Sequence, residues 1–147
     1  MSARDFVAAN DAERTRLASF VKKASDAVLS RPVSGGWTAA GVLGHLAFWD
    51  QRVVELVETW EREGIAPRPY QEADIDWIND AAKPFLLAVP PRKAAELALA
   101  IAETADRKVA ALSDRMLEQL QAAGNPMSVN RAEHRREHLP ELEALLE

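Results

Sequence analysis

The chain has 147 residues, of which 48% are hydrophobic and 28% charged, with a formal net charge of −5 and no cysteine. This length suits a single domain over residues 1–147 that is large enough to bury a core. The acidic balance and the lack of a basic run argue against a nucleic-acid partner, and the missing cysteines exclude disulfides, thiolate ligands and a cysteine nucleophile.

Two amphipathic helices are predicted in the first half of the chain. The first runs from Asp5 to Leu29, because apolar residues recur there at steps of three and four. The second begins at Thr38, a favourable N-cap, and runs to Glu63, just before Gly64, which suits a helix end. Its apolar positions alternate in steps of four and three, as packing in a helix bundle requires.

A long connection of about 26 residues, 64–89, follows the second helix, whereas connections in helix bundles usually have about 2–8 residues. Such a crossover lets the next long helix run parallel to the second one. A short helix from Asp74 to Ala82 is expected within it. We therefore predict an all-α fold, a four-helix bundle of up-down-down-up topology with a long crossover between helices two and three.

Two further helices are predicted in the second half. The third runs from Pro90 to Leu112, since proline is tolerated in the first turn. Its expected inward positions are Leu97, Ile101, Ala105, Val109 and Leu112. The fourth starts near Ser128 and runs toward the C-terminus. Pro140 lies inside it and removes one backbone hydrogen bond, so a kink or a break is expected there.

The three histidines of the chain form the candidate metal site. His134 and His138 are four residues apart, so they share one helix face and can bind one ion. His45 lies beside the apolar positions of the second predicted helix. Three neutral imidazoles suit Zn, Ni, Cu or Fe better than Mg or Ca. Three protein ligands leave a coordination position open, as in catalytic sites.

A simpler interpretation of the same residues is open. A histidine pair at this spacing often occurs without a metal, and His45 would then be a packing residue of the core. Zinc proteases of one common kind have a glutamate directly after the first histidine of the pair. Arg135 stands at that position here, which argues against such a protease.

Three segments resemble the DinB-like superfamily. Residues 36–38 and 44–50, Gly-Trp-Thr and Gly-His-Leu-Ala-Phe-Trp-Asp, resemble its second-helix signature. Residues 133–140, Glu-His-Arg-Arg-Glu-His-Leu-Pro, resemble its fourth-helix signature, and residues 112–117 resemble the segment after helix three. The resemblance implies an up-down-down-up four-helix bundle that is often dimeric.

The resemblance also implies a divalent metal, Zn or Ni first and Fe or Mn as further possibilities. Its ligands would be one histidine on helix two and two on helix four, which match His45, His134 and His138. Relatives include thiol-dependent S-transferases, the N-terminal domains of mycothiol-dependent maleylpyruvate isomerases, and small resistance proteins that hydrolyse reactive natural products.

The function implied by the resemblance is a metal-dependent enzyme acting on a small-molecule substrate. It would be either a thiol-dependent S-transferase in detoxification, with a low-molecular-weight thiol cosubstrate, or a hydrolase. The alternative is a metal- or ligand-binding bundle protein without turnover, for sequestration or resistance. Which catalytic and cofactor-binding residues would act is left open.

Four tryptophans receive different assignments. Trp77 in the crossover and Trp37 before the second helix are the candidate pocket residues, because functional residues concentrate in loops. Trp49 and Trp60 are assigned to the core. Asn79, also in the crossover, resembles a family position to which no role is assigned.

Charged residues near the histidines have two interpretations each, and we favour the second in both cases. Four carboxylates either orient ligating imidazoles or lie on solvated helix surface: Asp50, Glu133, Glu137 and Glu141. Three arginines either bind the carboxylates of a thiol cofactor or balance neighbouring glutamates through weak i,i+4 contacts: Arg131, Arg135 and Arg136.

No membrane partner is expected. No apolar run approaches the ~20 residues that cross a bilayer, and the N-terminal residues lack the pattern of a signal peptide. A cytoplasmic protein is the resulting expectation, and the family resemblance adds the expectation of a homodimer.

Overall fold

The computed structural model describes residues 3–66 and 72–147, and within these ranges it is helical without any strand. The expected all-α fold is thereby confirmed. The α-helices are α1 Asp5–Lys23, α2 Asp26–Leu29, α3 Ala39–Glu63, α4 Ile75–Ala88, α5 Pro91–Ala110, α6 Asp114–Ala122 and α7 Ala132–Glu143. Short 3₁₀ turns occupy Ser34–Gly36, Glu72–Asp74 and Ala144–Leu146.

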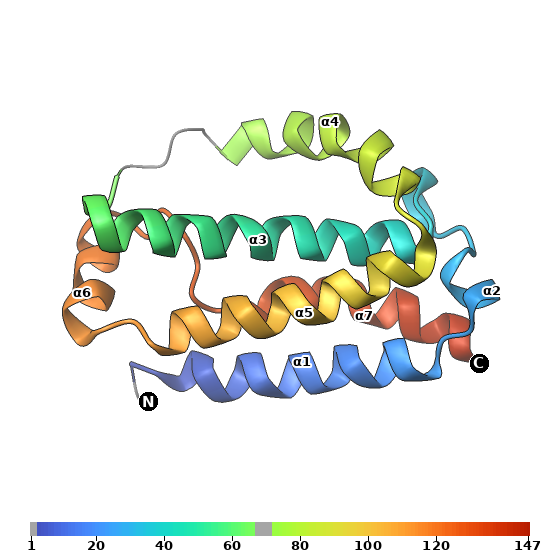
Figure 1. Ribbon diagram of the computed structural model, residues 1–147, viewed down its shortest axis with the longest axis horizontal. Helices are drawn as coiled ribbons and strands as arrows, with labels where there is room; N and C mark the ends of the chain where they lie inside the picture. The colour runs from blue at the N-terminus through green and yellow to red at the C-terminus, as the bar shows by residue number, and fades with distance from the viewer. Residues whose placement is uncertain (1–2, 67–71) are drawn as a thin grey trace.

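The long helices α1, α3, α5 and α7 lie alongside one another, and α4 runs along the outside of α3 (Figure 1). Helix α5 packs against both α1 and α3, while α7 packs against α1 and α3. This arrangement brings α7 next to α3 although most of the chain lies between them. No helix in the described ranges combines the length and apolarity needed to cross a membrane.

The predicted boundaries of α3 are confirmed. The Thr38 hydroxyl accepts a hydrogen bond from the backbone N–H of Gly41 at 3.0 Å, as an N-cap does. The helix ends at Gly64, whose φ of +84° suits glycine.

The prediction of one continuous helix from Asp5 to Leu29 was wrong, because α1 ends at Lys23. Ser25 starts α2 instead, its hydroxyl accepting from the backbone N–H of Val28 at 3.2 Å. The end of α1 is also held from outside. The Arg92 guanidinium donates to the carbonyl of Ala24 at 2.8 Å. This bond gives a partner to a carbonyl group at the helix end that has none within the helix.

The inward face of α5 differs from the predicted one. The predicted Ala105, Val109 and Leu112 are buried, but Leu97 is 36% exposed and Ile101 only half-buried. The face turned to the core is formed largely by alanines: Ala94, Ala95, Ala98, Ala102 and Ala105. Small side chains leave room for α5 to approach its neighbours closely.

Three other helices differ from expectation. Helix α4 continues past Ala82 to Ala88, through Pro84, and α6 was not predicted as a helix. Helix α7 starts at Ala132, four residues later than expected, and continues through Pro140 to Glu143. The expected break at Pro140 is therefore not found.

Candidate metal centre

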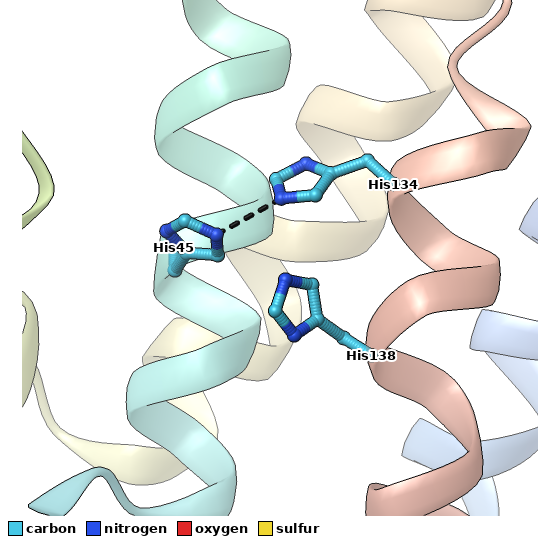
Figure 2. Close-up of side chains that lie close together, drawn as sticks. All are labelled: His45, His134 and His138. Carbon is cyan, nitrogen blue, oxygen red and sulfur yellow. Dashed lines mark hydrogen bonds between the residues drawn. The ribbon is translucent and has the colours of Figure 1, made fainter. Parts of the chain in front are cut away.

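The three histidines converge from two helices. His45 comes from α3, and His134 and His138 come from successive turns of α7, with their rings turned toward one another (Figure 2). The Nε2 atoms of His45 and His134 lie 2.9 Å apart. The ring centroid of His138 is 5.0 Å from each of the other two. The structure thus brings together all three predicted ligands.

The spacing of the ring nitrogens fits a bound metal ion. One nitrogen from each histidine can be chosen so that all three lie within 4.8 Å of one another. In a tetrahedral zinc site with Zn–N bonds of about 2.0–2.1 Å, neighbouring nitrogens stand about 3.3 Å apart. The nitrogen of His45 that faces His134 is Nε2, and the Nδ1 atom on the other side of the ring is buried without a hydrogen-bond partner among the described residues. The donor set and its spacing therefore fit a divalent transition metal.

Burial keeps two of the imidazoles, those of His45 and His134, neutral at neutral pH. Burial, together with the neighbouring His138, lowers the pKa of His45 to about 4. Burial also lowers the pKa of His134 to about 2, with further contributions from the two other histidines and from Arg131 and Arg135. At neutral pH both rings keep a lone pair available, as metal ligation requires.

A buried ion network lies directly beside the histidines. Arg135, 1% exposed, donates two hydrogen bonds to the Asp106 carboxylate at 2.8 and 2.9 Å and one to Asp50 at 3.1 Å. Asp50 also accepts from Arg131 at 2.9 Å, and Asp106 from Arg14 at 2.6 Å. Since Asp50 belongs to α3, Asp106 to α5 and Arg135 to α7, the network ties three helices together next to the site.

The start of α7 is fixed by a residue of another helix. Asn10 of α1 is 1% exposed, and its side-chain oxygen accepts from the backbone N–H groups of Arg131 and Ala132 at 2.8 and 2.9 Å. Its amide nitrogen donates to the carbonyl of Val129 at 3.0 Å. A side chain from α1 therefore acts as the cap of the helix that carries two of the metal ligands. Sequence reasoning missed both Asn10 and Asp106.

The favoured interpretation of the arginines, contacts with neighbouring glutamates, was wrong for Arg135 and Arg136. Neither binds a neighbouring glutamate of α7: Arg135 binds Asp50 and Asp106, and Arg136 donates to Glu13 of α1 at 3.2 Å. Asp50 does not lie on solvated surface, nor does it orient an imidazole, because it is 3% exposed and accepts from two arginines.

The three other candidate carboxylates are exposed. Glu141 accepts hydrogen bonds from the backbone N–H and the hydroxyl of Ser34 at 2.7 and 3.1 Å. These bonds lower its pKa. Glu137 lies at the wall of the cavity described next. The backbone N–H of Glu133 donates to the side-chain oxygen of Asn130 at 3.3 Å.

An open cavity of about 750 Å³ adjoins the three histidines and is lined by residues of α3, α4 and α7 and of the loop before α3. Of the two candidate pocket residues, Trp37 lines it and Trp77 does not. Trp77 is 58% exposed, and its indole N–H donates to Asp74 at 3.0 Å.

Trp49 lines the same cavity and is half-buried, so its assignment to the core was wrong, whereas Trp60 is 5% exposed and belongs to the core. The indole N–H of Trp49 donates to the side-chain oxygen of Asn79 at 2.8 Å. This bond gives Asn79 a role, since it joins α4 to α3 at the cavity wall.

One family model matches most of the chain. The model of the DinB superfamily matches residues 9–141, a range that includes all three histidines and the cavity residues of α3, α4 and α7. Searches of curated proteins and of solved structures gave no significant match. Because the match covers most of the sequence, the chain belongs to the DinB superfamily.

Proposed function

We propose that this protein is a metal-dependent enzyme acting on small molecules, with one divalent ion held by His45, His134 and His138. The observation that carries the proposal is the convergence of three imidazoles at an open cavity of about 750 Å³. A cavity of this size accommodates a small organic molecule. Zn or Ni is our first choice of metal, with Fe as a further candidate, because imidazole suits these ions. Mn is a candidate from the family resemblance alone, since it prefers oxygen ligands.

When bound, such an ion supplies Lewis acidity toward a thiol, a carbonyl or a water molecule. The protein's own contribution is to bind and orient the substrate. Trp37 and Trp49 give the cavity apolar walls for the substrate. Glu137 follows His134 by three residues, so it lies on the same face of α7. Its exposed carboxylate lines the cavity and can take up a proton that the substrate releases.

Two reactions are compatible with this arrangement: S-transfer from a low-molecular-weight thiol, and hydrolysis. A panel of electrophiles offered with several thiols, and the same electrophiles in water alone, distinguishes them. Turnover that needs a thiol supports the transferase, and turnover without one supports the hydrolase.

The first test is elemental analysis of the purified protein, combined with its thermal shift on adding and chelating Zn or Ni. At a free ion concentration of 100 times the dissociation constant, metal binding should stabilise the fold by about 2.7 kcal/mol. His45→Ala and His134→Ala should lose both metal and turnover while remaining helical. Glu133→Gln, a change on the exposed face of the same helix, is the control and should keep both.

Two outcomes would change the proposal. Metal binding without turnover across the panel would indicate a sequestration protein. A purified protein without metal, unshifted by Zn or Ni, would leave the histidines as packing residues and refute a metal-dependent function.

We also propose a specific topology for the all-α fold. We infer a single-domain, up-down-down-up four-helix bundle of α1, α3, α5 and α7. The course of the chain supports it, since α3 and α5 both start at the end of the molecule where α2 lies (Figure 1).

Exposed aromatic side chains on α4, Trp77 and Phe85, support the expected homodimer, which light scattering can test. A cytoplasmic location stays a prediction from the sequence.

A further inference from the structure

The cavity beside the three histidines has an acidic lining. Four carboxylates line it: Asp76, Asp80, Glu137 and Glu141. Among the described residues that line it, the one cationic side chain is Arg131, which is 9% exposed and already donates to the buried Asp50. Without a bound metal, the lining therefore carries an excess of formal negative charge, and a divalent ion on the histidines would offset part of it.

The arrangement of these carboxylates is unfavourable for the fold alone. Asp76 and Asp80 are four residues apart on α4, and Glu137 and Glu141 are four residues apart on α7. Like charges at this spacing on a helix repel each other. Asp76, Asp80 and Glu137 form no ion pair with any described residue that would offset the repulsion. A cation bound between α4 and α7 would offset it.

The geometry favours an organic cation over a second metal ion. Within the described ranges, the three histidines are the one set of potential ligands gathered closely enough to bind a metal. The carboxylates are spread along two helices, which suits the diffuse charge of an ammonium group on a larger molecule. Their field would also be focused by the concave wall.

Aromatic and unsatisfied polar groups in the same cavity also indicate a ligand. Trp37 and Trp49 line it, and indole faces attract cations. The ring of Trp37 does so within the protein itself, because Nζ of Lys83 lies 5.3 Å from its centroid. His45, 9% exposed, has a buried Nδ1 without a partner on the side of the ring away from His134 (Figure 2).

The arginines point to the same conclusion. A thiol cosubstrate rich in carboxylates would need cationic side chains to receive it. Arg135 is buried between two aspartates and Arg136 is paired with Glu13, so neither is available in the cavity.

We propose that this cavity binds small molecules that carry an amine or another organic cation beside an apolar or aromatic part, and that it disfavours polyanionic ones. The proposal rests on the proposed function, since it names the ligand class of the same cavity. Any thiol cosubstrate would accordingly be uncharged or cationic.

The test uses three probes that share a phenylalkyl group: phenethyltrimethylammonium, 2-phenylethanol and 3-phenylpropanoate. The quaternary ammonium has no lone pair and cannot ligate a metal, so its binding reports charge alone. Binding is followed by NMR titration of the full chain at low salt, both as purified and after chelation. Metal content is measured on the same samples.

The cation should bind about fivefold more tightly than the alcohol, and the anion more weakly than both in the chelated protein, because screened surface charges act with this strength. In Asp76→Asn/Asp80→Asn the preference for the cation should be lost. The control Glu61→Gln/Glu118→Gln removes two exposed carboxylates outside the cavity lining, so it changes the net charge equally and should keep the preference. Circular dichroism checks that both variants are folded.

The proposal is overturned if the chelated protein binds the anion as tightly as the cation, or if none of the probes binds at millimolar concentration. It is also overturned if both double variants lose the preference equally, since the effect would then come from net charge. A protein without metal that still prefers the cation would refute the metal-dependent function alone. A metal-loaded protein without charge preference would refute this proposal alone.

Discussion

Replacing Asp106 by asparagine should destabilise the protein strongly while preserving the shape of the side chain. Asp106 is 4% exposed and accepts hydrogen bonds from Arg135 at 2.8 and 2.9 Å and from Arg14 at 2.6 Å. The substitution removes a negative charge that faces two cations. Removing one partner of a buried ion pair costs about 3–5 kcal/mol, and the partial exposure of Arg14 favours the lower end, about 3 kcal/mol.

The reverse deletion, Arg135→Met, should cost less. It leaves Asp50 paired with Arg131 at 2.9 Å and Asp106 paired with Arg14 at 2.6 Å, so that neither buried carboxylate loses its last cation. Replacing a buried charge by an apolar side chain of similar volume is often close to neutral when no partner is left unpaired. We expect a loss of about 1 kcal/mol, well below that of Asp106→Asn.

Urea unfolding with a chelator present measures both changes without a contribution from metal binding. With a slope of about 2 kcal/mol per molar urea, a loss of 3 kcal/mol lowers the midpoint by about 1.5 M. Asp114→Asn is the matched control, because Asp114 pairs with Arg4 at 2.8 Å but has a side chain 86% exposed. It should cost below about 1 kcal/mol. Equal losses for Asp106→Asn and Asp114→Asn, or a larger loss for Arg135→Met, would refute the reasoning.

Three further predictions concern the site and its supports. In chelated protein, the free energy of unfolding should fall as the pH drops from about 6.5 toward 4. Burial lowers the pKa of His45 to about 4 and that of His134 to about 2. Over this pH range the unfolded chain therefore binds protons at these histidines before the folded one does. Each of these two histidines should contribute up to about 1.4 kcal/mol per pH unit, and urea midpoints that do not change with pH would contradict this. Asn10→Ala should cost about 2–4 kcal/mol in urea unfolding, since it leaves three backbone groups, two of them buried, without their partner. A loss below 1 kcal/mol would mean that water replaces the amide. A double-mutant cycle of Trp49→Phe and Asn79→Ala should give a coupling of about 1 kcal/mol, and strictly additive losses would show that this bond does not hold α4 to α3.

Local rules were sufficient for the features that depend on neighbouring residues. The N-cap Thr38 and the terminal Gly64 defined α3 because each acts on residues within one turn. The pair His134 and His138 was recognisable because helix geometry alone puts residues i and i+4 on one face. The predicted helix bundle made a meeting of this pair with His45 feasible, and the family resemblance made it the favoured interpretation.

The features that were missed depend on contacts between distant parts of the chain. Helix α1 ends where Arg92, from the start of α5, donates to the carbonyl of Ala24. Helix α7 begins where Asn10 of α1 caps it. On α5, the leucine at position 97 gave a stronger apolar signal than the alanines, although close packing selects the smaller side chains for the buried face. Rules that consider only residues within one turn of a helix cannot predict these contacts, because the partners lie far apart in the sequence.

The same distinction explains why polar residues determine the orientation of α7. Its buried residues include two leucines, Leu139 and Leu142, which would tolerate a modest rotation of the helix, since apolar contacts are not directional. Arg135 would not, because rotation would leave its guanidinium buried without the two aspartates that it binds. Since Arg135 follows His134 directly, any rotation that withdrew the histidines from His45 would also break this network. The ion network therefore keeps the ligands in place, so the convergence of the histidines does not depend on the metal.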